Sequence, residues 1–174
     1  MVNAKVTKFR LGPDAPAIAC YQLYANGIAR RLRSAMQPAC GVLQAMDSIL
    51  LVDDEPSVLL AWRLILELEG FQVLCAENGL RALELLERHL PTLVITDWTM
   101  PKMDGNELCR RISSDRRLAS LPVIVHSSVD VPLSPQSAWS VFLRKPCPPD
   151  RVVETVRRLC AEERQSRLSR LRVI

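Results

Sequence analysis

Three aspartates follow two mainly apolar runs of the sequence, and their positions suit the binding of a metal cation. Asp53 and Asp54 come directly after the run 49–52, and Asp97 comes directly after the run 93–96. If these runs are neighbouring strands, the three carboxylates converge and repel one another. A hard cation such as Mg²⁺ relieves that repulsion and also binds phosphate oxygens. The pattern therefore points to phosphoryl transfer.

Two further polar residues follow later apolar runs. Ser127 lies just beyond the run 123–125 and offers a hydroxyl group, and Lys145 lies just beyond the run 141–143 and offers a cation. A phosphoryl group carried on a carboxylate needs positive charge and hydrogen-bond donors around its oxygens. A single aspartate after a strand is more commonly a helix cap or a turn residue. The combination of acids, hydroxyl and cation favours a functional site.

The elements that must position these residues alternate regularly from Asp47 onward. Short apolar runs predict five strands, at residues 49–52, 71–76, 93–96, 123–125 and 141–143. Apolar residues at helical spacing predict helices that begin at Pro56, near Gly79, after the turn 100–105 and at Pro149. This alternation predicts an α/β fold with helices on both faces of a parallel sheet. Ligands of such sheets bind at the carboxyl ends of the strands.

Composition limits the class of protein. The chain has 174 residues, of which 48% are apolar and 24% are charged, as in a soluble globular domain with appendages. We expect no membrane span, because no apolar run approaches the roughly 18 residues that a membrane helix needs. The six cysteines form no C-x-x-C pair, which disfavours a zinc site or a disulfide framework. A reducing, cytoplasmic location is therefore expected.

The charge is unevenly distributed between the two ends of the chain. Residues 1–46 carry a net charge of +5, whereas residues 47–174 carry −1. The excess of basic residues is therefore no evidence that the main domain binds nucleic acid. We expect a basic N-terminal appendage at residues 1–46 that is disordered or non-native, a main domain at 47–163 and an Arg-rich helical tail at 164–174.

The appendage has three explanations. Because Met46 directly precedes the first strand, a start there would make residues 1–45 a translation artefact or an extension. An Arg-rich, acid-poor segment can also be a targeting peptide, although the apolar region of a secretory signal is missing. Thirdly, the segment could be a docking helix, in which Asn26–Gly27 would be a weak point. Its apolar stripe would consist of Ile18, Tyr21, Ala25, Ile28, Leu32 and Met36, with Arg30, Arg31 and Arg33 beside it.

Four motifs in this order resemble the receiver domain of two-component response regulators. They are LVDDEP at 51–56, TDWTMPKMDG at 96–105, HSS at 126–128 and KP at 145–146. The segment around Trp98 is especially similar to the chemotaxis regulator that binds the flagellar motor switch. The resemblance covers about residues 47–163. It implies a doubly wound, flavodoxin-like fold with five parallel strands in the order 2-1-3-4-5.

The resemblance also implies a metal site and an acceptor. Asp97 would accept the phosphoryl group. Asp54 would bind Mg²⁺ or Mn²⁺ directly together with Asp97, Asp53 would bind it through water, and the backbone carbonyl of Thr99 would be a further ligand. The implied phosphodonor is a sensor histidine kinase or a histidine phosphotransfer protein. The downstream protein target stays unknown, and no direct nucleic-acid binding is expected.

Three other residues have roles that the resemblance implies. Ser127 would close over the phosphoryl group, and Lys145 would pair with it. Phe142 would be the aromatic side chain that moves inward when Ser127 moves. Members of the family also hold the bond between this lysine and the following proline in cis, here Lys145–Pro146.

The sequence departs from the family pattern between the fourth and fifth strands. Pro132 and Pro135 fall within residues 129–140, where receivers usually have a full helix. Because a proline in a helix interior costs about 3 kcal/mol, we expect a shortened fourth helix of a turn or two. Cys147 also replaces an aromatic residue that is common after the Lys–Pro pair. These departures concern the usual output face rather than the phosphorylation chemistry.

The expected function is a stand-alone response regulator with no turnover beyond its own phosphorylation and dephosphorylation. The same residues fit a phosphorelay sink, a receiver fragment of a hybrid kinase, or an interaction module with vestigial phosphorylation. A Mg²⁺-dependent phosphatase of the haloacid dehalogenase type is disfavoured, because Thr99 stands where that class needs a second acid. A Rossmann nucleotide site is disfavoured because no G-x-G-x-x-G follows the first strand.

Overall fold

The computed structural model describes residues 46–130 and 138–171, and in them strand and helix alternate as the sequence predicts. The strands are β1 Ser48–Val52, β2 Gln72–Ala76, β3 Leu93–Thr96, β4 Val123–Ser127 and β5 Val141–Arg144. The helices are α2 Pro56–Leu68, α3 Gly79–Arg88, α4 Gly105–Ser114 and α5 Pro149–Leu171. The second strand begins one residue later than predicted, at Gln72 rather than Phe71.

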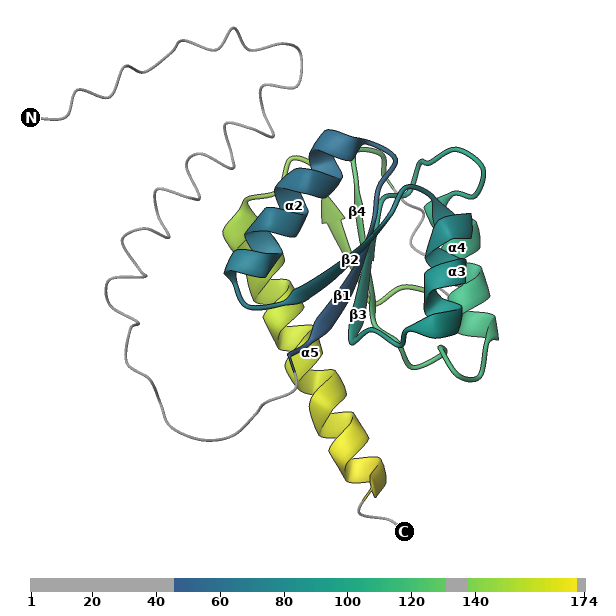
Figure 1. Ribbon diagram of the computed structural model, residues 1–174, viewed down its shortest axis with the longest axis vertical. Coiled ribbons are helices and arrows are strands. Elements are labelled where there is room, and N and C mark those ends of the chain that lie inside the picture. Colours follow the sequence, from purple (N-terminus) through teal and green to yellow (C-terminus); the bar gives the residue numbers. More distant parts are fainter. Residues whose placement is uncertain (1–45, 131–137, 172–174) are drawn as a thin grey trace, which may run out of the picture.

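The five strands form one parallel sheet in the order β2-β1-β3-β4-β5, which confirms the predicted topology. Helices α2 and α5 cover one face of the sheet, and α3 and α4 cover the other (Figure 1). Val52 is in register with Thr96, and Thr96 is in register with Val125. The last residues of β1, β3 and β4 therefore lie at one edge, where the polar residues that follow them can meet.

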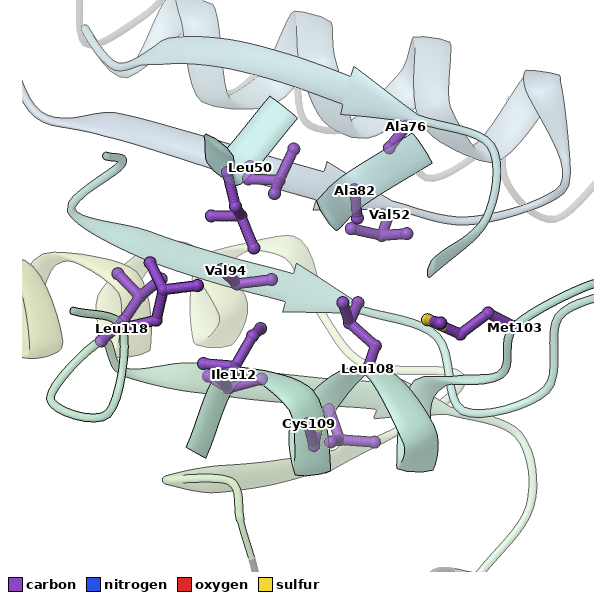
Figure 2. Close-up of a cluster of buried hydrophobic side chains, with 14 of the residues drawn as sticks. Leu50, Val52, Ala76, Ala82, Val94, Met103, Leu108, Cys109, Ile112 and Leu118 are labelled. Carbon is purple, nitrogen blue, oxygen red and sulfur yellow. The ribbon is translucent and has the colours of Figure 1, made fainter. Parts of the chain in front are cut away.

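Each face of the sheet has its own apolar core, because alternate residues of a strand point to opposite faces. Leu50 and Val52 of β1 pack toward α3 and α4 with Leu108 and Ile112, in the cluster that Figure 2 shows. The intervening Ile49 and Leu51 pack in a second cluster toward α2 and α5. These four β1 side chains are buried, as expected for a strand covered on both faces.

The ends of the helices follow ordinary capping rules. Gly70 has φ 90, a left-handed backbone conformation that terminates helix α2. Asn78 caps α3 by accepting a hydrogen bond from the Arg81 N–H at 3.0 Å. Asp104, interpreted from the sequence as a turn residue, is the cap of α4 and accepts from the Glu107 N–H at 2.8 Å. The sequence signal for this helix cap was Asp104 followed three residues later by Glu107.

The predicted shortening of the helix between β4 and β5 concerns residues 131–137, which lie outside the described residues. The flanking residues 128–130 and 138–140 are not helical. Helix α5 is long and continues past the end of the sheet (Figure 1). Across residues 46–130 and 138–171, no helix combines the length and the apolar character that crossing a membrane requires.

A chain that begins at Met46 is expected to fold cooperatively and to keep its phosphorylation chemistry. The first strand begins at Ser48, and every buried apolar residue of the described structure lies between Ile49 and Cys160. Thermal unfolding followed by circular dichroism would test this. A broad, non-cooperative transition in the shortened chain would show that the core depends on residues 1–45.

Candidate functional site

The three aspartates converge at the carboxyl edge of the sheet, as the sequence predicts. One carboxylate oxygen from each of Asp53, Asp54 and Asp97 lies within 4.8 Å of the others. Asp53 is only 4% exposed, Asp97 is partly buried and Asp54 is exposed. The cause is the pairing of β1 with β3, which sets the residues after Val52 beside the residue after Thr96. An oxygen-only donor set of this kind fits Mg²⁺.

Lys145 brings a cation into the same cluster. Its Nζ lies 2.8 Å from Asp53 Oδ2 and 3.5 Å from Asp97 Oδ2. The Glu55 N–H donates a further hydrogen bond to Asp53 Oδ1 at 3.0 Å. Burial raises the pKa of Asp53, and Lys145 opposes that increase. Lys145 thus offsets part of the repulsion among the acids.

Backbone hydrogen bonds fix the orientation of Asp97. Its N–H donates to the Val52 carbonyl at 2.9 Å, which continues the pairing of β1 with β3. The Trp98 N–H donates to Asp97 Oδ1 at 2.7 Å. One carboxylate oxygen of Asp97 is therefore held by the backbone, and the other lies beside Lys145.

The loop from Trp98 to Asp104 closes tightly against the start of α4. The Gly105 N–H donates to the Trp98 carbonyl at 2.9 Å. A Cβ atom at Gly105 would lie 2.1 Å from the Asp97 carbonyl oxygen and 2.9 Å from Trp98 Cα. Gly105 therefore positions the acceptor loop, a role that the sequence analysis missed. The Asp-Gly pair at the predicted start of this helix was the signal that could have found it.

The remaining predicted site residues lie around this cluster. Ser127 ends β4 and is buried, and its Oγ accepts from the Val129 N–H at 3.4 Å. The Lys145 N–H donates to the Ser127 carbonyl at 2.8 Å, which ties the two residues together through the backbone. Thr99 is exposed in the loop after β3. The Lys145–Pro146 bond is cis, as the family resemblance implies.

Phe142 lies in β5, in register with Val125, and is partly buried. Its ring packs against Trp139 at a centroid distance of 6.3 Å. The aromatic residue proposed to move with Ser127 is thus on the neighbouring strand.

His126 has a packing role. Its ring meets Trp62 edge to face at a centroid distance of 5.3 Å, and its side chain is buried. Burial lowers the pKa of His126 to about 4, so that the imidazole is neutral at pH 7. A neutral, buried ring suits the contact with Trp62.

A doubly wound parallel sheet with three clustered acids and a lysine at its carboxyl edge is the arrangement expected of phosphoryl-binding α/β proteins. Comparison with known families gives the assignment. Residues 49–157 match the response regulator receiver domain, and the chain belongs to this family.

The proteins similar to this chain differ in how much of their length the alignment covers. The chain is 39% identical over 124 residues to response regulator Rre1 of Synechocystis, an alignment that covers 68% of this chain and 54% of that regulator. It is 30% identical over 122 residues to protein PilH of Pseudomonas aeruginosa, covering 67% of this chain and 99% of that protein. The chain thus spans about half the length of one relative and nearly all of the other.

A solved structure of a response regulator with bound Mg²⁺ provides a further comparison. The response regulator TrrA of Thermotoga maritima, solved in complex with Mg²⁺-BeF, has 30% sequence identity and a TM-score of 0.60. The match covers 66% of this chain and 99% of that chain. Receiver domains are signalling modules that bind Mg²⁺ at their acidic pocket and interact with histidine kinases and phosphotransfer proteins.

Millimolar Mg²⁺ is expected to stabilise the protein, because a cation that binds between the three acids binds the folded state alone. At ten times its dissociation constant it should raise the melting temperature by about 3–6 °C. It should also change the fluorescence of Trp98, which directly follows Asp97. The matched control is Asp54→Ala, an exposed position at which the increase should largely disappear. Equal melting curves for the native chain with and without Mg²⁺ would contradict a cation site.

Proposed function

We propose that Asp97 accepts a phosphoryl group from a phosphohistidine of a sensor kinase or phosphotransfer protein, and that the chain then switches conformation to signal. The observation that carries this proposal is the position of Lys145 Nζ, within 3.5 Å of carboxylate oxygens of both Asp53 and Asp97. The Lys145 ammonium group can pair with a phosphoryl group on Asp97. Its contact with Asp53 can then be given up, so that Asp53 is available to bind the metal. The burial of Asp53 also limits competition from water.

The proposed transfer is a displacement at phosphorus. The Asp97 carboxylate attacks, a bond forms between its oxygen and phosphorus, and the phosphorus–nitrogen bond of the phosphohistidine breaks. With a proton already on the other ring nitrogen of the phosphohistidine, the histidine leaves as a neutral imidazole, and Asp97 becomes an acyl phosphate. The hydrogen bond from the Trp98 N–H to Oδ1 orients the carboxylate for attack.

The metal and the remaining residues have distinct proposed roles. Asp53, Asp54, Asp97 and the Thr99 carbonyl would hold Mg²⁺, which when bound neutralises charge on the phosphoryl oxygens. Ser127 would exchange its hydrogen bond with Val129 for one to the phosphoryl group. Phe142 would follow this movement, because its strand pairs with β4. The Phe142 contact with Trp139 would then be altered.

We favour a stand-alone regulator over a segment of a larger kinase. The alignment with PilH covers 99% of that protein, which supports a receiver that works without an attached output domain. A phosphorelay sink uses the same residues and differs only in what receives the signal.

Incubation with Mg²⁺ and acetyl phosphate tests the proposed chemistry. The protein should gain one phosphoryl group, measured by intact mass. Hydroxylamine should remove it, since the bond to a carboxylate is an acyl phosphate. A label that resists hydroxylamine would place the phosphoryl group on a hydroxyl and would contradict the proposal.

The phosphorylated state is expected to be long-lived. Thr99 and Val129 would flank the path of a hydrolytic water, as the receiver resemblance implies, and both are exposed. Neither side chain can act as a strong base or orient water as an acid or amide would. The half-life should therefore exceed that of fast chemotaxis regulators, and Thr99→Glu or Val129→Gln should shorten it. Loss of the label within seconds at neutral pH would refute this prediction.

A further inference from the structure

The first residue of α3, Gly79, lies against the acceptor loop, which we define as residues 98–104. The Gly79 N–H donates a hydrogen bond to the Met103 carbonyl at 3.1 Å. Gly79 is buried, and a Cβ atom on it would lie 2.9 Å from this carbonyl oxygen, 2.6 Å from Met103 Cγ and 2.9 Å from Met103 Sδ. Side-chain carbons do not approach other heavy atoms this closely in a packed interior. The contact therefore requires a residue without a Cβ atom at position 79.

The acceptor loop is held at two points. At its base the Gly105 N–H donates to the Trp98 carbonyl at 2.9 Å. On its far side Gly79 holds Met103, whose side chain is buried in the apolar cluster that α3 and α4 share (Figure 2). Thr99, whose carbonyl is a further metal ligand in the proposed site, lies between these two points along the chain. The contact with Gly79 therefore helps to fix the position of that carbonyl.

The acceptor loop has little freedom to absorb a displacement between these points. Lys102 has φ 67, in the left-handed region that few residues other than glycine adopt. The Met103 N–H donates to the Pro101 carbonyl at 2.8 Å, which closes a three-residue turn around Lys102. Lys102 Nζ also lies 3.6 Å from Glu77 Oε1, just before α3. A shift of Met103 is therefore passed along the loop toward Thr99 rather than taken up locally.

We propose that Gly79 is a positioning residue for the phosphorylation site and acts on it through Met103. The three acids and Lys145 follow β1, β3 and β5, whereas Gly79 lies on the helix after β2. Its close approach transmits the position of α3 to the acceptor loop and so to the Thr99 carbonyl. The effect on the metal rests on the proposed function, whereas the close approach of Gly79 to Met103 does not.

Gly79→Ala is expected to weaken Mg²⁺ binding about tenfold, because the added Cβ displaces Met103 and the loop that carries the Thr99 carbonyl. Helix propensity alone predicts a more stable α3 and unchanged Mg²⁺ binding, since alanine favours a helix more than glycine does. Tryptophan fluorescence during a Mg²⁺ titration of the full chain measures the dissociation constant. The Mg²⁺ concentration that gives half the maximal labelling rate with acetyl phosphate should rise by the same factor.

Two further variants separate positioning from a general structural effect. Leu80→Ala changes an exposed neighbour in the same turn of α3 and should leave Mg²⁺ binding unchanged. Met103→Ala removes Cγ and Sδ, two of the three nearest atoms that the Cβ would meet, and keeps the carbonyl oxygen. Adding Gly79→Ala to Met103→Ala should therefore weaken Mg²⁺ binding by a smaller factor than adding it to the native chain.

Circular dichroism verifies that each variant folds. Should Gly79→Ala not fold, Met103→Ala and Gly79→Ala/Met103→Ala give the same comparison, because the carbonyl oxygen would still lie 2.9 Å from the Cβ. Equal Mg²⁺ affinity in the native chain and in folded Gly79→Ala, whatever the change in stability, would overturn the proposal. An equal loss in the native and Met103→Ala backgrounds would overturn the role of Met103. A native chain that binds Mg²⁺ but takes no label from acetyl phosphate would refute the proposed function and leave the test of Gly79 intact.

Discussion

The Asp97→Asn variant is expected to take up no phosphoryl group from acetyl phosphate or from a phosphohistidine protein. An amide is a far poorer nucleophile than a carboxylate and a poorer ligand for Mg²⁺, although its shape is almost the same. The hydrogen bond from the Trp98 N–H can be kept by the amide oxygen, so the fold should survive. Intact mass after incubation measures the result, and the circular dichroism spectrum verifies the fold.

Variants of the neighbouring residues should behave differently from Asp97→Asn. Lys145→Ala and Ser127→Ala each remove a proposed contact to the phosphoryl oxygens but leave the nucleophile, so labelling should slow without disappearing. Asp54→Ala should approach the Asp97→Asn result at low Mg²⁺ and recover partly at high Mg²⁺. If Asp97→Asn labels at the native rate, Asp97 is not the acceptor.

The Gly105→Ala variant is expected to lose about 3 kcal/mol of unfolding free energy, or more. The added Cβ would lie 2.1 Å from the Asp97 carbonyl oxygen. This atom belongs to the backbone between β3 and α4, so it cannot move aside as the end of a flexible side chain would. Urea unfolding measures the loss, and the displaced Asp97 should also label more slowly.

Gly70→Ala is the matched control for this substitution. Gly70 has φ 90, and a Cβ there would meet no atom within 4 Å. The expected cost is the backbone strain alone, about 1–2 kcal/mol. The labelling rate should be unchanged, because Gly70 lies after α2 at the opposite end of β1 from the acids. Equal stability of Gly105→Ala and the native chain would show that the close approach at Asp97 is relaxed in solution.

The sequence by itself determined the fold class, the strand order and the grouping of the acids. Runs such as 49–52 and 93–96 report strands buried on both faces, because burial is encoded in each residue's own polarity. Asp53, Asp54 and Asp97 were predictable as a cluster because strand ends in a parallel sheet meet at one edge. The four receiver motifs supplied the strand order that places β1 beside β3.

Tertiary structure alone decided the contacts that depend on distance between remote residues. The approach of Lys145 to Asp53 across 92 positions, and of Gly105 to the Asp97 carbonyl, results from how the strands and loops pack together. The Asp-Gly pair marks a turn at Gly105, and Lys145 follows a predicted strand, but neither signal gives the distance to Asp97 or Asp53. The exposure of Leu60 and Leu68 could not be predicted from the sequence either. Apolar residues in a helix are expected to be buried, and only the packing of neighbouring elements shows which of them are exposed. Sequence patterns report which residues prefer burial, whereas packing determines which of them obtain it.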